Sequence, residues 1–221
     1  MLFFEVNYLP IRVLLIQNSD WSDNVTTIKV FSDFACPFCY IGLSIADRLR
    51  KENPDVHFEY YPYELEPDAP AEGYDFSDQY PMNKIEESYK RIMRLGSEYG
   101  LVYNNKVKKS NTHRLHKASL YAKKEDKFFE FGREAYKAIF EDFKNLADPK
   151  VINDIGLAAG LNIAEMNRCI DGGNFDEFME EAKNLISVYD IESVPTFILE
   201  DGTQVTTLKE YEKFKKDLLG D

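Results

Sequence analysis

Residues 27–49 read TIKVFSDFACPFCYIGLSIADRL, and within them Cys36 and Cys39 are separated by one proline and one phenylalanine. The apolar, β-branched run 27–31 predicts a strand, and the apolar spacing of 41–49 predicts a helix. A strand that turns into a helix places Cys36 at the helix N-terminus, where unpaired N–H groups and the helix dipole stabilise a thiolate. Pro37 fits the first helical position because no hydrogen bond is lost there. The stretch therefore predicts a redox-active pair of thiols.

A C-x-x-C pair also occurs as half of a zinc site, so the other possible ligands matter. These are Cys169, His57, His113 and His116, and none lies at the short spacing of a zinc ribbon or finger from the pair. The redox interpretation is therefore favoured over a structural zinc site. It implies no metal, nucleotide or organic cofactor, because the disulfide itself carries two electrons.

A second informative segment, residues 193–199, reads SVPTFIL and precedes Asp201-Gly202. It predicts a strand, a tight turn and a second strand, with Pro195 at the strand entry where it costs no ladder hydrogen bond. An ordinary edge-strand proline is the simpler interpretation. However, Val194-Pro195-Thr196-Phe197 ahead of a hairpin resembles the cis-proline loop of the thioredoxin superfamily. That resemblance implies a loop that faces the two thiols and presents the Val194 backbone to an extended substrate.

The chain between the two motifs is long and patterned as helices. Pro195 follows Cys36 by about 160 residues, far more than a bare thioredoxin or glutaredoxin domain would allow. Apolar residues at spacings of three and four predict helices over residues 83–99, 112–122, 128–143 and 149–159. Asp148 and Pro149 provide an N-cap and a first-turn proline for the last of these, and Gly160 ends it. We therefore expect an inserted helical bundle.

A thioredoxin-like domain interrupted by helices and carrying a C-P-x-C centre resembles the DsbA family of thiol-disulfide oxidoreductases, and most closely its FrnE-like branch. The resemblance covers roughly residues 26–219 and is carried by 31–42, 111–116, 160–161 and 194–197. It implies an α/β fold with the following division: an N-terminal extension at 1–25, a discontinuous thioredoxin-like domain at 26–66 and 190–221, and an inserted α-helical domain at 67–189. Phe38 replaces the histidine that DsbA has between the cysteines, so that side chain gives no electrostatic help to the thiolate.

The expected reaction is dithiol–disulfide exchange with protein thiols and disulfides or with small thiols similar to glutathione. Cys36 is expected to be the nucleophile or the attacked atom, and Cys39 to resolve the mixed disulfide. Substrate-binding residues are expected to be Pro37, Phe38, Val194, Pro195, Thr196 and His113. Ser32, Asp33 and Phe34 are expected to shape the approach to the sulfurs.

Two other functions remain open on the sequence. Glutathione-dependent 2-hydroxychromene-2-carboxylate isomerases and kappa-class glutathione transferases resemble this chain in architecture, but they typically hold a serine where Cys36 stands. The second alternative is a non-enzymatic chaperone module that holds unfolded clients on an apolar surface near Phe34, Phe38 and Tyr40. Retention of both cysteines favours redox exchange.

The composition fits a compact soluble protein. The chain has 221 residues, 44% of them hydrophobic, and a net charge of −12, which argues against nucleic acid or an anionic membrane as partner. The densest basic patch is Lys106, Lys108 and Lys109, which we expect to form a solvated loop. Cys169 is expected to face the core of the helical bundle, with a resolving or regulatory thiol as the alternative.

The first 25 residues contain apolar runs that raise the possibility of a secretory signal or membrane anchor. Glu5, Pro10 and Arg12 interrupt those runs, and no signal-like charge order or cleavage site is present. The segment is also too short in apolar residues to span a bilayer. We therefore expect a cytoplasmic protein, in which a C-x-x-C pair is a catalytic or redox-sensing device.

Overall fold

The structure is a computed structural model that describes residues 25–75, 81–104 and 108–220. The predicted N-terminal extension at 1–25 lies outside the described residues except for Val25, and so does Lys106 of the basic patch. Among the residues described, no helix is both long and apolar enough to cross a membrane.

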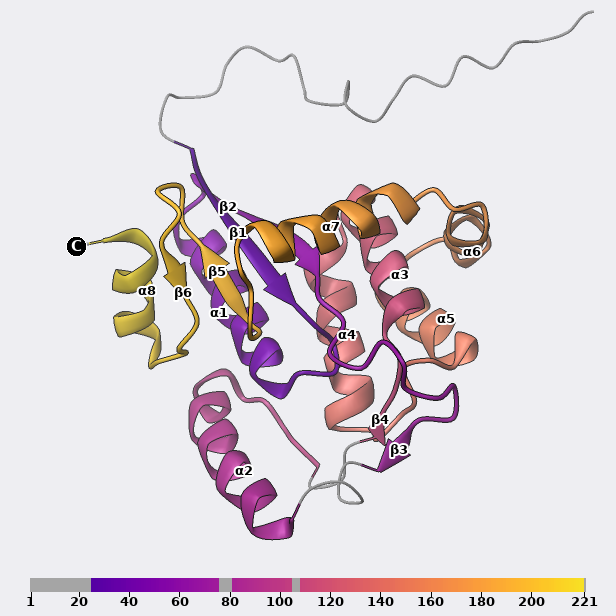
Figure 1. The fold of residues 1–221 in the computed structure, drawn as a ribbon, viewed down its shortest axis with the longest axis horizontal. Coiled ribbons are helices and arrows are strands. Elements are labelled where there is room, and N and C mark those ends of the chain that lie inside the picture. The colour runs from indigo at the N-terminus through magenta and orange to yellow at the C-terminus, as the bar shows by residue number, and fades with distance from the viewer. Residues whose placement is uncertain (1–24, 76–80, 105–107, 221) are drawn as a thin grey trace, which may run out of the picture.

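A four-stranded mixed sheet forms the centre of the molecule, in the order β2-β1-β5-β6 (Figure 1). Its strands are β1 (Thr26–Ser32), β2 (Val56–Pro62), β5 (Thr196–Ile198) and β6 (Gln204–Val205). Strands β1 and β2 are parallel, whereas β5 pairs antiparallel with both β1 and β6. The two sequence motifs therefore meet in neighbouring strands, because β1 leads into Cys36 and β5 begins directly after Pro195.

The remaining chain is mostly helical, and α2 to α7 all lie between β2 and β5 in the sequence. The helices are α1 (Pro37–Glu52), α2 (Met82–Gly96), α3 (His113–Lys124), α4 (Phe128–Phe140), α5 (Pro149–Ala158), α6 (Ile163–Asp171), α7 (Asp176–Val188) and α8 (Tyr211–Leu219). A 3-10 turn, Ser97–Tyr99, follows α2, and β3 (Tyr74–Asp75) pairs antiparallel with β4 (Lys108–Lys109). The expected α/β fold with a large helical insertion is thus observed.

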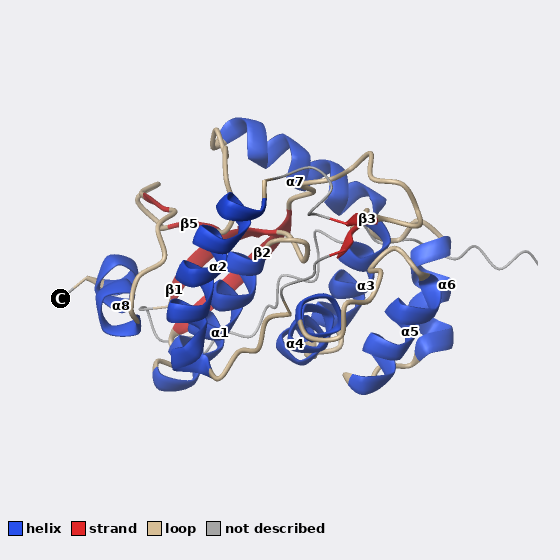
Figure 2. Ribbon diagram, turned by 90° about the horizontal axis from the view of Figure 1, so that it is seen from below, coloured by secondary structure: helices blue, strands red, loops and turns tan. Residues whose placement is uncertain are grey.

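Helices cover both faces of the sheet, as the alternation of apolar residues along β1 requires. Ile28 and Val30 point into the main core together with the apolar residues of α1, whereas Phe31 points to the other face. There Phe31 joins Ala182 of α7 in a second, smaller apolar cluster. Seen from below in Figure 2, α7 lies on one side of the strands and α1 on the other.

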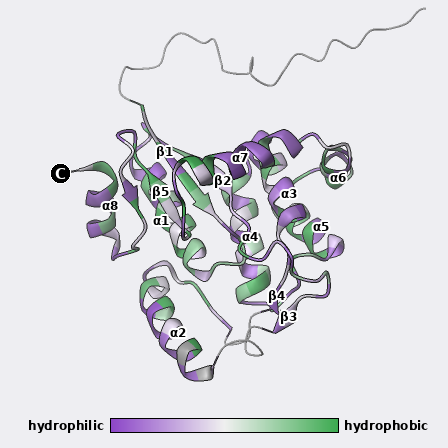
Figure 3. Cartoon of the chain, viewed as in Figure 1, coloured by the Kyte–Doolittle hydropathy of each residue, from purple (hydrophilic) through white to green (hydrophobic). Residues whose placement is uncertain are grey.

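The inserted helices attach to the sheet domain through aromatic packing between α1 and α4. Tyr136 of α4 stacks on Tyr40 of α1 with ring centroids 5.1 Å apart, and it also contacts Phe34 at 5.2 Å. Gly132 permits this approach, because a Cβ atom there would lie 2.8 Å from Leu43 Cδ2. Figure 3 shows purple and green alternating along α2 and α8, as expected for helices with one buried face.

The predicted helix positions agree with the observed ones to within a few residues at the C-terminal ends. The Asp148 carboxylate caps α5 by accepting a hydrogen bond from the Lys150 N–H at 2.8 Å, and Gly160 adopts the expected left-handed conformation after that helix. Cys169 is buried in α6, as predicted. Helix α7 and strand β2 were not predicted from the sequence.

Candidate active site

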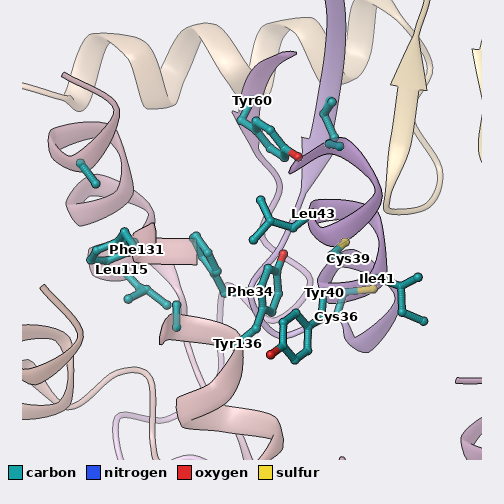
Figure 4. Packing of buried hydrophobic residues seen from close by; sticks show 14 of the residues in the cluster. Phe34, Cys36, Cys39, Tyr40, Ile41, Leu43, Tyr60, Leu115, Phe131 and Tyr136 are labelled. Atoms are coloured by element: carbon teal, nitrogen blue, oxygen red, sulfur yellow. The ribbon is translucent and has the colours of Figure 1, made fainter. Parts of the chain in front are cut away.

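Cys36 is the N-cap residue of α1, and its extended backbone turns the chain from β1 into the helix. The Cys39 N–H donates to the Cys36 carbonyl oxygen at 3.0 Å, so the second sulfur lies one turn further on. Both thiols are free, and Figure 4 shows the two sulfurs together on α1. Cys36 is 6% exposed and Cys39 is 1% exposed, so Cys36 is the outer and Cys39 the inner member of the pair.

The two thiols differ in acidity. A hydrogen bond from Cys39 lowers the pKa of Cys36, and the positive charge of Lys109 lowers it further, so that together they outweigh burial. Burial raises the pKa of Cys39 well above its usual value, and its interactions with Cys36 add to that rise. The site therefore stabilises a thiolate at the outer sulfur and a protonated thiol at the inner one.

The loop before β5 faces the outer sulfur. The Val194–Pro195 peptide bond is cis, and in its thiol form Cys36 Sγ donates to the Val194 carbonyl oxygen at 3.4 Å. Pro195 packs closely on α1, because a Cβ atom at Gly42 would lie 3.2 Å from Pro195 Cγ. Thr196 is buried, and its hydroxyl donates to the Ser193 carbonyl oxygen within the same loop.

A fully buried carboxylate, Asp33, organises the turn in front of the cysteines. Its Oδ1 accepts hydrogen bonds from the Ala35 N–H at 3.1 Å and the Thr112 hydroxyl at 2.8 Å, and it lies 3.3 Å from His116 Nε2. Its Oδ2 accepts from the Leu65 N–H at 2.7 Å. Burial alone would raise the pKa of Asp33, but the interactions with His116 and with these N–H groups hold it below its usual value.

The environment of Lys109 was predicted wrongly from the sequence. It was expected in a solvated loop, but it is buried, and its ammonium donates to the Ala35 carbonyl oxygen at 3.0 Å. A cation therefore lies beside the residue that precedes Cys36, in the position to favour the thiolate. No local pattern distinguishes Lys109 from the neighbouring lysines, because its burial results from the pairing of β3 with β4.

Two other expectations about the surroundings of the dithiol concern residues that are buried. Ser32, Asp33 and Phe34 lie beneath the motif, so any influence on the approach to the sulfurs is indirect. Tyr40 is buried as well, so the apolar client-binding surface expected near Phe34, Phe38 and Tyr40 is not present as a surface. Only Phe38 of that set is partly exposed, and the Arg91 guanidinium lies over its ring at 5.3 Å.

The remaining predicted binding residues lie around this site or beside it. Pro37 is partly exposed, and its carbonyl oxygen accepts from the Tyr103 hydroxyl at 3.2 Å. His113 is partly exposed at the start of α3, where its Nδ1 lies 2.7 Å from Glu64 Oε1. The backbone N–H of His113 donates to Asn111 Oδ1, so the Asn111 side chain caps the start of α3. The Thr112 hydroxyl donates to Asp33 instead. Among the residues that the structure describes, no group of three His, Cys, Asp or Glu side chains is placed to hold a metal ion.

Comparison with known proteins identifies the family. Residues 27–219 match the model of the DSBA-like thioredoxin domain, which covers the dithiol, the helical insertion and the cis-proline loop. The chain belongs to the DSBA-like thioredoxin family. Its fold is therefore the thioredoxin-like fold with an extra helical insertion.

Two individual proteins that resemble this chain can be compared with it directly. The chain is 27% identical over 180 residues to the uncharacterized protein YwbO of Bacillus subtilis, a match that covers 79% of this chain and 86% of YwbO. A probable DsbA oxidoreductase from Streptomyces coelicolor superposes with a TM-score of 0.74 at 18% identity, over 87% of this chain and 88% of that one.

Two further neighbours share the fold but carry different activities in their names. The cytosolic disulfide reductase DsbM from Pseudomonas aeruginosa superposes with a TM-score of 0.61 at 15% identity, over 86% of this chain and 96% of that one. A 2-hydroxychromene-2-carboxylate isomerase superposes with a TM-score of 0.64 at 15% identity, over 81% of this chain and 88% of that one. At these identities the likeness concerns the fold alone.

Proposed function

We propose that the protein is a thiol-disulfide oxidoreductase that exchanges its Cys36–Cys39 pair with thiol or disulfide substrates. The observation that carries this proposal is the difference between the two sulfurs. A stabilised thiolate at the outer sulfur and a protonated thiol beneath it are the states that attack and resolution require.

The exchange can be written in two steps. The Cys36 thiolate attacks a disulfide R–S–S–R, which forms a Cys36–S–S–R bond and releases R–S⁻. Cys39 then gives up its proton and attacks Cys36 Sγ, which forms the Cys36–Cys39 disulfide and releases the second R–S⁻. The protein loses two electrons and the substrate gains two, and the reverse order of steps oxidises a dithiol substrate.

The loop before β5 is the proposed docking site for the substrate. The Val194 carbonyl oxygen accepts from the Cys36 thiol, and ionisation of Cys36 frees that acceptor for a backbone N–H of the substrate. Pro195, Pro37 and Phe38 would border the bound chain, and Thr196 would shape the loop from inside. His113 would lie further out, on α3.

Small thiols belong to the proposed substrates as well as protein thiols. DsbM, a neighbour of the same fold, has been solved with GSH and is described as a cytosolic reductase. By that analogy we place this protein in the cytoplasm, where a C-x-x-C pair is a redox catalyst or sensor and not a structural link.

The test is the equilibrium of the purified protein with graded mixtures of reduced and oxidised glutathione, followed by thiol alkylation and mass measurement. A two-electron transition that is lost in Cys36→Ser and kept in Cys169→Ser is expected. If no internal disulfide forms at any ratio, the oxidoreductase proposal is wrong, and assay for a glutathione-dependent isomerase becomes the next step.

A further inference from the structure

Three buried hydroxyl groups lie in the part of the core that holds the inner sulfur, and each interacts electrostatically with it. Ser32 Oγ and Tyr136 Oη lie 3.1 Å apart, and the Tyr136 hydroxyl is also 3.3 Å from the Asp33 carbonyl oxygen that it can donate to. The Ser32 hydroxyl also interacts with Cys39 and lowers the pKa of that thiol, against the larger effect of burial, which raises it. Ser32 ends β1 and Tyr136 is on α4, so the sheet and the inserted helices each supply one partner.

Tyr60 of β2 supplies the third hydroxyl, and it is the one without a partner. The residue is 6% exposed, and its Oη has no hydrogen-bond partner among the residues that the structure describes. Figure 4 shows the hydroxyls of Tyr60 and Tyr136 pointing from opposite sides toward the part of α1 that carries Leu43 and Cys39. A buried hydroxyl left unpaired costs about 1–3 kcal/mol, so this one requires an explanation.

A small cavity joins these groups. Its volume is about 20 Å³, and the polar residues among those that line it are Ser32, Tyr60, Tyr61, Tyr136, His116 and Ser119. A cavity needs roughly 10–15 Å³ and two to four polar partners to hold one water molecule. The volume meets the first condition, the lining contains several residues with hydroxyl groups, and Tyr60 Oη is the partner that such a water would satisfy.

The proposed exchange requires a route for the proton of Cys39. Cys39 is 1% exposed, so the proton that leaves it on attack, or returns to it on reduction, has no direct access to solvent. Asp33 is a poor acceptor for that proton. Its two oxygens already face the donors of Ala35, Thr112, His116 and Leu65, and these hold its pKa below the usual value.

We propose that Ser32, Tyr136 and Tyr60 bind one water molecule in this cavity, and that this hydroxyl–water network carries the proton to and from Cys39 Sγ. The inference rests on the proposed function and adds to it the route taken by the proton of Cys39. The S–H bond of Cys39 breaks and a new O–H bond forms at Ser32, which passes its own proton to Tyr136 or to the water; the network takes no part in the sulfur–sulfur bonds. His116 lines the same cavity, and its imidazole can take up the proton that the network delivers.

The test separates the two steps of the exchange. The reduced protein is mixed with glutathione disulfide and quenched at intervals, and mass measurement follows the Cys36–glutathione mixed disulfide and its conversion to the internal disulfide. For Tyr60→Phe we expect the mixed disulfide to form at the wild-type rate and to be resolved at least about tenfold more slowly. This decrease is smaller than the rate loss usually caused by removal of a general acid or base. A crystal structure should show the water within hydrogen-bond distance of Tyr60 Oη.

The matched control is Tyr61→Phe, because Tyr61 also lines the cavity but its hydroxyl donates to Glu59. It should leave both steps unchanged. Resolution at the wild-type rate in Tyr60→Phe would overturn the relay while leaving the proposed function standing, whereas failure of the wild type to form either disulfide would overturn the proposed function itself. If Tyr60→Phe does not fold, Tyr136→Phe tests the same network and should also slow resolution alone.

Discussion

Asp33 shows how much of this site depends on one side chain that no substrate can touch. It is fully buried, and its carboxylate links three segments of the chain. It accepts hydrogen bonds from Ala35 in the turn after β1, from Leu65 in the loop after β2, and from Thr112 at the start of α3. An uncharged amide of the same shape would turn its NH₂ group toward one of these donors. The charge is therefore part of the architecture of the dithiol turn.

We predict that Asp33→Asn lowers the free energy of unfolding by about 2–4 kcal/mol near neutral pH, as for a buried charge whose partners are left unpaired. The pKa of Asp33 is lowered in the folded state, so the stability it contributes is present above about pH 4 and is lost as the pH falls through the folded-state pKa. Urea denaturation between pH 3 and pH 7 should therefore show the difference from wild type shrinking on acidification.

Asp176→Asn is the control for this experiment, because Asp176 is an exposed carboxylate that pairs with the partly buried Lys117 at 2.6 Å. That substitution should change stability little at any pH. An Asp33→Asn variant as stable as wild type at pH 7 would show that the carboxylate charge is not needed.

At the level of elements, periodic patterns were sufficient for most of the fold. The helices α2 to α5 follow the spacing of their apolar residues, and α5 begins at the predicted cap Asp148. Helix α7 was not predicted, although its buried Met179 and Ala182 lie three apart. Strand β2 was also not predicted, although the apolar Val56, Phe58 and Tyr60 alternate with the polar His57 and Glu59 as in a half-buried strand.

The contact between α1 and the loop before β5 offers a test of how closely these two elements must meet. A Cβ atom at Gly42 would lie 3.2 Å from Pro195 Cγ and 3.5 Å from Phe197 Cζ. We predict that Gly42→Ala displaces the loop and slows disulfide exchange about tenfold, since misplacement of about 1 Å can cost a hundredfold. Stability should change little, because the helix gains about 1 kcal/mol from alanine and loses a similar amount to the contact.

Gly132→Ala is the matched substitution on α4, where the new Cβ would lie 2.8 Å from Leu43 Cδ2 and away from the loop. It should lower stability by about 1–3 kcal/mol through overpacking and leave the exchange rate of the folded protein unchanged. The two variants therefore separate loop position from core packing. Equal loss of exchange in both would contradict the assigned role of Gly42.

Across the whole molecule, three segments far apart in the sequence meet at Cys36. The motif on α1 and the loop before β5 were predicted from their residue types, because each has a local signature. Lys109 was not, since its position at the dithiol depends on the path of the chain through the short β3–β4 sheet and into α3. The inserted region thus supplies a charge to the site as well as packing.

We predict that Lys109→Met makes Cys36 less acidic. After the hydrogen bond from Cys39, the positive charge of Lys109 is a further cause of the lowered pKa of Cys36. Removing the charge raises that pKa, so less thiolate is present at a given pH. The rate of Cys36 alkylation by iodoacetamide, measured against pH in the Cys39→Ala, Cys169→Ala background, should have its midpoint at higher pH in the variant.

The same substitution should also change the redox equilibrium, because a stabilised thiolate favours the reduced pair. With Lys109→Met the wild-type cysteine pair should be more fully oxidised at a given ratio of reduced to oxidised glutathione. Lys108→Met, on the adjacent and less buried residue of β4, serves as control and should leave both the alkylation midpoint and the equilibrium close to wild type. An unchanged midpoint in Lys109→Met would mean that the hydrogen bond from Cys39 and the end of α1 suffice to hold the thiolate, and that the inserted region contributes packing alone.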